Sequence, residues 1–124
     1  MIHFTIPGEL CDLNTYIAAE RAHKNKAAKI KEEETHRCAM EARVARVQEV
    51  PEGMYPVMVH LTWYTKDKRK DVDNVTFAKK FILDGLVDAF IIENDSRKYV
   101  RMVQDQDVLV DKKNPRVEVS IFPA

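Results

Sequence analysis

Two aspartates and an asparagine stand together in the run Asp71-Val72-Asp73-Asn74, where a segment of strand character gives way to one of helical character. If the run is extended, alternate residues share a face, so the carboxylates of Asp71 and Asp73 project to the same side. Neighbouring carboxylates repel one another, and the arrangement is favourable chiefly when oxygen ligands hold a hard cation such as Mg²⁺ between them. Asp and Asn before a helix are also ordinary capping and turn residues. The run therefore indicates either a metal site or a helix start.

A third acidic group, Glu93-Asn94-Asp95, follows the helix that this run begins. A helix packed against a sheet and followed by a turn back would return Asp95 to the neighbourhood of Asp71 and Asp73. Glu93 and Asp95 are also common loop residues, so on residue types alone both explanations stay open.

The order and spacing of these groups resemble the RusA family of Holliday-junction resolvases. Those enzymes show an acid-x-acid-Asn run, a lysine four residues before an Asp-x-Leu step, and an acidic pair after the helix. The corresponding features here are residues 70–74, Lys80 with Asp84-Gly85-Leu86, and residues 91–95. An Ile-Pro-Gly…Leu-Asn start at residues 6–14 extends the match loosely.

The resemblance implies a metal-dependent, structure-selective endodeoxyribonuclease that resolves Holliday junctions by paired, symmetrical phosphodiester hydrolysis in DNA recombination and repair. By the same resemblance, Asp71, Asp73 and Asp95 bind Mg²⁺ or Mn²⁺, and Lys80 assists. A carboxylate-held metal ion supplies both an activated water and compensation for charge on the phosphate oxygens. Because two symmetrical cuts suit a two-fold enzyme, we expect a homodimer bound to four-way or other branched DNA.

Three departures from the family pattern stand out. The interval from Asp73 to Lys80 is about three residues longer, Asn94 replaces the first acid of the pair, and Phe90 stands where the family tends to place glycine. Two other functions therefore stay open. One is a catalytically silent branched-DNA-binding protein of the same fold, and the other is a metal nuclease acting on another branched or flap DNA.

Helical geometry distinguishes the adjacent lysines, Lys79 and Lys80. At about 100° per residue, Lys80 returns to within roughly 20° of the direction of Asp73, whereas Lys79 points about 120° away. If residues 73–80 are helical, Lys80 and Asp84 share the polar face with Asp73.

The overall charge does not indicate a nucleic acid partner, because 20 Lys and Arg balance 20 Asp and Glu. The local distribution of charge does favour one. We expect two basic runs to contact phosphates on either side of the acidic site. They are Lys24, Lys26, Lys29 and Lys31, and Lys66, Lys68, Arg69 and Lys70. Such runs are also common as solvated faces.

The composition indicates a single folded domain over residues 1–124, with 45% hydrophobic and 32% charged residues. No apolar run approaches the roughly 20 residues that cross a bilayer, and the first residues lack signal-peptide character, so we expect a cytoplasmic protein without membrane contact. The two cysteines and four histidines show no zinc-binding spacing.

Hydrophobic patterning predicts the elements that position these residues. Residues 2–6 are predicted to form a short strand. Residues 14–48 are predicted to be mostly helical, with Asn14 as the N-cap and a break within 23–29. Alternating apolar positions from Tyr55 to Trp63 predict a strand with one buried face.

Asp73 or Asn74 is the expected N-cap of the next helix, because the spacing of apolar residues after it is that of a helix. A single apolar stripe follows, formed by Val75, Ala78, Ile82, Leu86 and Ala89. Residues 97–104 and 116–122 are predicted strands, expected to pair as an antiparallel hairpin through a turn at 111–115. The order β-α-β-α-β-β predicts an α/β (α+β) sandwich, with helices packed on a mixed sheet.

Overall fold

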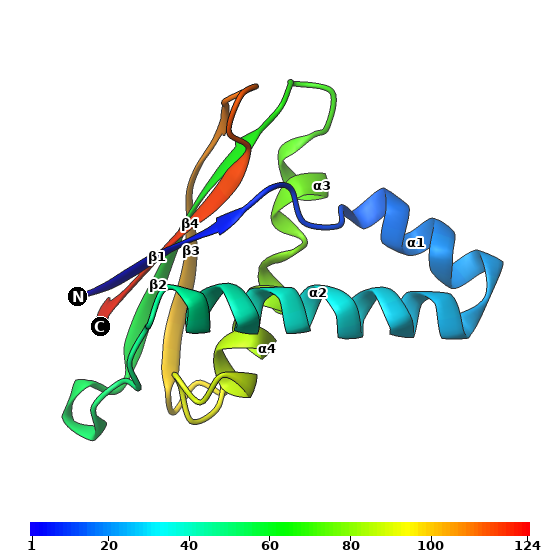
Figure 1. The fold of residues 1–124 in the computed structure, drawn as a ribbon. Coiled ribbons are helices and arrows are strands. Elements are labelled where there is room, and N and C mark those ends of the chain that lie inside the picture. Colours follow the sequence, from blue (N-terminus) through cyan, green and yellow to red (C-terminus); the bar gives the residue numbers. More distant parts are fainter.

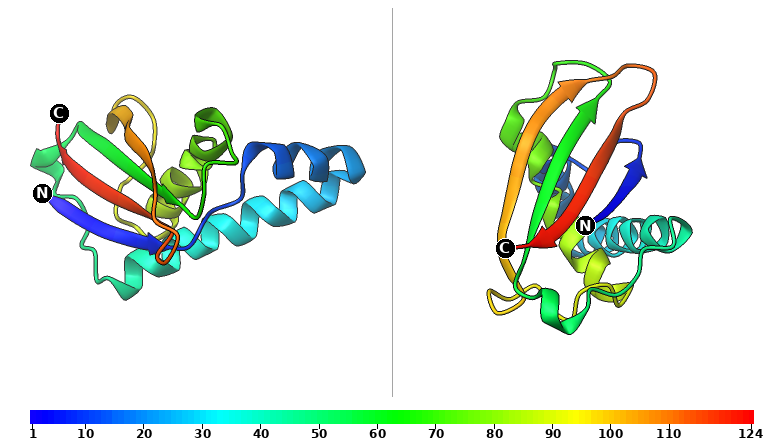
Figure 2. Two further views of the ribbon diagram at one scale, coloured as in Figure 1. Left: turned by 90° about the horizontal axis from the view of Figure 1, so that it is seen from above. Right: turned by 90° about the vertical axis from the view of Figure 1, so that its left-hand side faces the viewer.

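The computed structural model describes all 124 residues and places the α-helices on one side of a four-stranded sheet (Figures 1 and 2). The elements are, in order, β1 (Ile2–Pro7), α1 (Leu13–Ala22), α2 (Lys24–Val44), the 3₁₀ helix η1 (Glu52–Met54), β2 (Val57–Thr65), α3 (Val72–Thr76), α4 (Lys79–Asp88), β3 (Val100–Val110) and β4 (Arg116–Pro123). The predicted class, a mixed sheet with helices packed on it, is confirmed. No helix has the length and apolar character needed to cross a membrane.

The strand order in the sheet is β1-β4-β2-β3, with β4 antiparallel to both of its neighbours and β2 parallel to β3. The predicted hairpin of the last two strands is therefore wrong, because β2 lies between them. The turn at 111–115 forms, but it carries the chain past the end of β2, where Asp111 N–H donates to Thr65 O at 2.8 Å. Since parallel neighbours need a crossover, α3 and α4 supply it between β2 and β3.

The core lies between the sheet and the helices. Every second residue of β2 from Val57 to Thr65 is buried, as the alternation predicts, and the residues between them are half-buried. Ile82 and Leu86 of α4 are buried on the opposite side of this core. The helix-covered face of the sheet is thus the apolar one, as the period-two pattern requires.

The long helical segment is divided at His23, inside the range expected for a break. His23 has extended backbone angles (φ −167°, ψ 132°), and its Nδ1 accepts a hydrogen bond from Asn25 N–H at 3.1 Å, which caps α2. Asp12, and not Asn14, caps α1 through Thr15 N–H at 2.7 Å. The resulting helical hairpin projects away from the sheet (Figure 1).

The predicted single helix after Asn74 is wrong, because α3 ends at Thr76 and α4 begins at Lys79. Aromatic packing accompanies the break. Phe77, at the junction, contacts the ring of Tyr16 on α1 and that of Phe81 on α4, with centroids 5.2 and 5.6 Å apart. The helical register that was to place Lys80 on the face of Asp73 is therefore interrupted.

Candidate functional site

Asp71 and Asp73 lie at the start of the crossover, directly after the loop that leaves β2. Asp71 occupies the N-cap position of α3 without a side-chain capping hydrogen bond, and Asp73 lies in the first turn. Both residues are exposed, and neither carboxylate forms a hydrogen bond or ion pair within the protein. Their side chains are free to bind a ligand from solvent.

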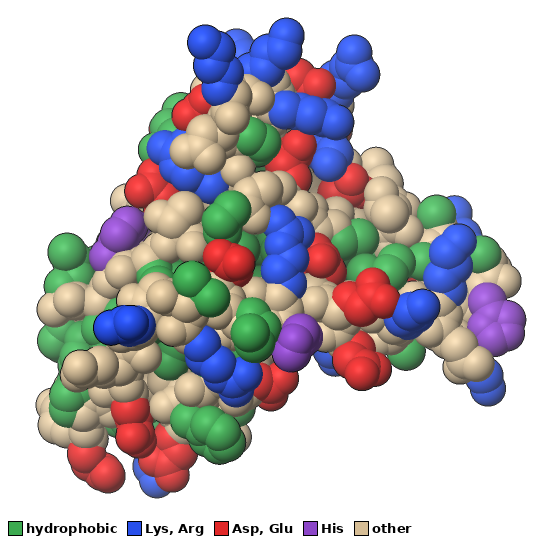
Figure 3. Space-filling model, viewed as in Figure 1, with side chains coloured by type: hydrophobic (Ala, Val, Ile, Leu, Met, Phe, Trp, Pro, Cys, Tyr) green, Lys and Arg blue, Asp and Glu red, His purple; other side chains and the backbone are tan.

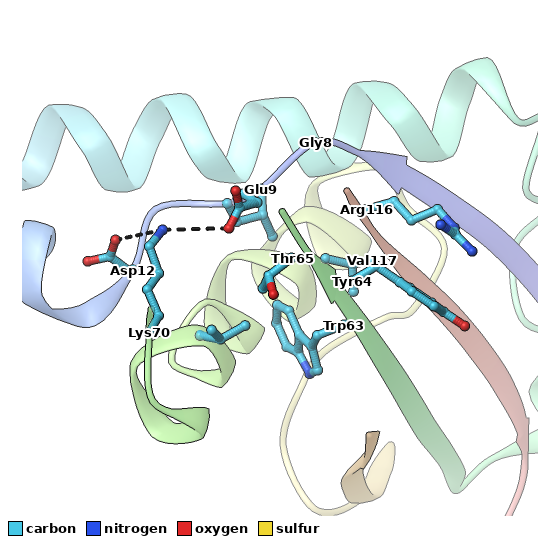
Figure 4. Close-up of a pocket in the computed structure, with 11 residues that line it drawn as sticks. Gly8, Glu9, Asp12, Trp63, Tyr64, Thr65, Lys70, Arg116 and Val117 are labelled. Carbon is cyan, nitrogen blue, oxygen red and sulfur yellow. Dashed lines mark ion pairs between the residues drawn. The ribbon is translucent and has the colours of Figure 1, made fainter. Parts of the chain in front are cut away.

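The segment that carries these aspartates is fixed to the start of α1. Asn74 Oδ1 accepts a hydrogen bond from Asn14 N–H at 2.9 Å. Lys70 Nζ lies 3.0 Å from Asp12 Oδ2 and 3.7 Å from Glu9 Oε1, beside a small cavity (Figure 4). Burial alone would lower the pKa of Lys70, but the contacts with Asp12 and Glu9 raise it above its ordinary value. Lys70 is therefore engaged within the protein.

Asp95 lies beside α4 and is paired with Lys80. Lys80 Nζ is 2.6 Å from Asp95 Oδ2 and 3.1 Å from Asp84 Oδ1. The hydrogen bond from Lys80 is the main cause of the lowered pKa of Asp95, and the same bond raises the pKa of Lys80. The structure thus brings together Lys80, Asp84 and Asp95, three of the residues singled out in the sequence.

The neighbouring lysine contacts a different carboxylate. Lys79 Nζ is 2.5 Å from Asp105 Oδ2, and Trp63 Nε1 donates to Asp105 Oδ1 at 2.9 Å. Asp105 stands opposite Leu61 in the parallel β2–β3 pair, so it lies on the helix-covered face. Asp105 was not predicted as a site residue, because it lies just beyond the predicted strand at 97–104 and that strand was expected to pair with residues 116–122.

The three predicted metal ligands are not assembled into one group. Asp71 lines a hollow with Lys68 and Lys70, whereas Asp95 lines another hollow, between α2 and α4, with Lys80. No three His, Cys, Asp or Glu side chains lie together in a geometry that would hold a metal ion. Asp71 and Asp95 thus line separate hollows, and the structure does not gather the three carboxylates into one cluster.

The predicted basic runs lie in two separate parts of the molecule. Lys66, Lys68 and Arg69 are exposed on the loop between β2 and α3. The run at 24–31 begins at the far end of the helical hairpin, where Lys29 pairs with Glu33 at 3.9 Å (Figure 1).

Comparison with protein-family models finds no match, and no curated protein shows significant similarity to this sequence.

Proposed function

We propose that this protein is a Mg²⁺-dependent, structure-selective endodeoxyribonuclease that resolves Holliday junctions. The supporting observation is the position of Asp71 and Asp73, two exposed and unpaired carboxylates beside a lysine-rich loop. Carboxylates alone would repel DNA, and adjacent cations offset that repulsion while contacting phosphates. The order of motifs over residues 70–95, which resembles the RusA family, supports the same proposal.

The proposal includes a cytoplasmic homodimer. A four-way junction is nearly two-fold symmetric, and its resolution requires two cuts in strands of like polarity. Two copies of the chain related by a two-fold axis would present one acidic site to each of these strands.

Mg²⁺ or Mn²⁺ enters the proposal through the resemblance and through the chemistry of carboxylate ligands. The side-chain arrangement does not favour Asp95 as a partner of Asp71, because Lys80 already neutralises Asp95. We therefore assign the first contact with a metal ion to Asp71 and Asp73.

A second candidate, a branched-DNA-binding protein without nuclease activity, is favoured by the placement of Asp71 and Asp95 in different hollows. The same acids would also serve a nuclease whose substrate is another branched or flap DNA.

Incubation of the purified protein with a labelled four-way junction, a flap substrate and a linear duplex, with and without Mg²⁺, tests these alternatives. Paired nicks at the junction that require Mg²⁺ support the proposal. Tight binding without cutting supports the DNA-binding protein, and cutting confined to the flap supports the other nuclease.

Substitution tests the acidic residues in the same assay. Asp71→Asn and Asp73→Asn should abolish cutting and preserve junction binding, because each removes a negative charge with little change in volume. Asp88→Asn is the matched control, since Asp88 is exposed on α4 and its carboxylate forms no hydrogen bond or ion pair within the protein. If Asp95→Asn cuts at the wild-type rate, Asp95 is not part of the active site.

A further inference from the structure

A second basic segment lies beside the loop between β2 and α3. The turn between β3 and β4 carries Lys112 and Lys113, and its Asp111 N–H donates to Thr65 O at the end of β2. Lys112 and three residues of the other loop, Lys66, Asp67 and Arg69, line one hollow. Two segments far apart in sequence thus form one surface, the basic tip, which comprises Lys66, Lys68, Arg69, Lys112 and Lys113.

The basic tip carries a strong local positive charge. All five of its side chains are exposed, and four of them form no ion pair. The exception is Arg69, whose Nε lies 3.6 Å from Asp67 Oδ2. Asp111 adds little opposing charge, because Arg116 Nη1 contacts its Oδ2 at 2.8 Å. Figure 3 shows Lys and Arg side chains gathered over this end of the molecule.

We propose that the basic tip binds the phosphate backbone of duplex DNA, and that Lys112 and Lys113 are DNA contacts equal in weight to Lys66 and Lys68. This inference rests on the proposed function and extends its binding surface to the turn at 111–115.

The residue types favour duplex DNA over single strands. Neither loop, residues 66–70 or residues 111–115, contains an aromatic side chain. Binding of single strands commonly uses aromatic residues on which bases stack, whereas contacts with a duplex backbone need only cations at suitable spacing.

The position of the basic tip also suits the proposed chemistry. Lys68, from the tip, and Asp71 line the same hollow at the start of α3. A DNA phosphate backbone bound across the two loops would therefore pass beside the exposed carboxylate of Asp71.

The test is the salt dependence of binding by the full-length protein, measured in EDTA with a labelled junction, a linear duplex and a single strand. Each phosphate contact contributes about 0.9 to the slope of log affinity against log salt on duplex DNA. Lys112→Gln/Lys113→Gln should therefore reduce that slope by about 1.8 on the junction and the duplex. The control, Arg97→Gln/Lys98→Gln, removes the same charge from exposed residues before β3 and should leave the slope unchanged.

The inference and the proposed function fail in different ways. An unchanged slope for Lys112→Gln/Lys113→Gln, in a protein that still binds and nicks junctions, overturns the inference alone. Equal slope reductions in the control variant show a general charge effect and overturn it as well. If Lys112→Gln/Lys113→Gln weakens binding to the single strand and not to the junction or the duplex, the basic tip binds single-stranded DNA and the duplex proposal is contradicted. A wild-type protein that binds none of these DNAs contradicts the proposed function itself.

Discussion

Two adjacent lysines, Lys79 and Lys80, bind carboxylates from different parts of the chain. Lys79 contacts Asp105 on β3, and Lys80 contacts Asp84 on its own helix and Asp95 in the following loop. The contacts with Asp105 and Asp95 fix α4 to β3 and to the loop that follows α4. Lys80 in particular determines the electrostatic environment of Asp95, the acid that the resemblance assigns to the metal.

We expect Lys80→Met to raise the pKa of Asp95 towards its ordinary value, because the hydrogen bond from Lys80 is the main cause of the depression. The stability that this pair contributes is present above the unfolded-state pKa of Asp95 and is lost as the pH falls through the lower folded-state value. On the alkaline side it is lost as the pH rises through the raised pKa of Lys80. The pKa of Asp95 is measured from the NMR chemical shift of its carboxyl carbon during an acid titration of the wild type and of Lys80→Met.

Lys79→Met is the matched control for this titration and should leave the pKa of Asp95 unchanged. An identical Asp95 titration curve in wild type and Lys80→Met would show that the ion pair does not persist in solution.

The ends of α2 and α4 share an unusual feature. Each helix is followed by a non-glycine residue in the left-handed region, Arg46 at φ 56° and Phe90 at φ 59°. After α4, Ile91 N–H donates to Leu86 O and Phe90 N–H to Val87 O, the two bonds of a Schellman motif. Phe90, which stands where the family that the sequence resembles tends to place glycine, therefore adopts a conformation that favours glycine.

We predict that Phe90→Gly raises the free energy of unfolding by about 1 kcal/mol, because it removes the steric cost of a positive φ. Little burial is lost, since Phe90 is 79% exposed. Urea denaturation measures the change. Phe90→Ala retains the positive-φ cost and should change stability little; an equal gain in both variants would mean that loss of the exposed ring is the cause.

Gly85 sets the distance between α2 and α4. A Cβ at this position would lie 2.6 Å from Cys38 Cβ and 3.0 Å from Ala39 N. Because neither atom belongs to a flexible side-chain end, the helices would have to separate.

Gly85→Ala should therefore destabilise the protein by about 1–3 kcal/mol, the usual range for overpacking. The control is Gly53→Ala, where an added Cβ meets nothing within 4 Å. Thermal or urea unfolding of both variants checks the difference, and equal stabilities would mean that the helices move apart at little cost.

The sequence predicted these elements unevenly, for physical reasons. The period-two pattern of β2 is a local consequence of one buried face, so it was readable from residues 55–63. The break at Phe77 was not, because no Gly or Pro between residues 74 and 84 signals it and the packing of Phe77 with Tyr16 is a tertiary contact. Turn residues at 111–115 predicted a turn correctly, but they carry no information about which strand lies between β3 and β4.

In the candidate site, too, local features could be predicted from the sequence, whereas features that depend on tertiary contacts could not. The exposure of Asp71 and Asp73 agrees with their polar types, whereas the partners of Asp95 depend on the path of the chain after α4. Lys112 and Lys113 were interpreted as turn residues, since their proximity to Lys66 depends on the strand order.

The proposed reaction requires two sites in one assembly. We expect sedimentation at micromolar concentration to show a homodimer, because paired cuts in a two-fold junction need two copies of Asp71 and Asp73. A single band of doubly nicked product, with few singly nicked intermediates, should accompany the dimer. A monomer that resolves junctions with paired cuts would contradict the symmetry argument.

The strand order also affects how the protein folds during synthesis. β1 is made before every other element, yet its sheet partner is β4, which follows all of them and also pairs with β2. A nascent chain on the ribosome therefore holds β1 without any strand partner until residues 116–123 have emerged, while β2 and β3 can already pair around their crossover. Since such long-range pairing slows folding, the emerging chain exposes strand edges to aggregation for longer than a protein with local pairing would.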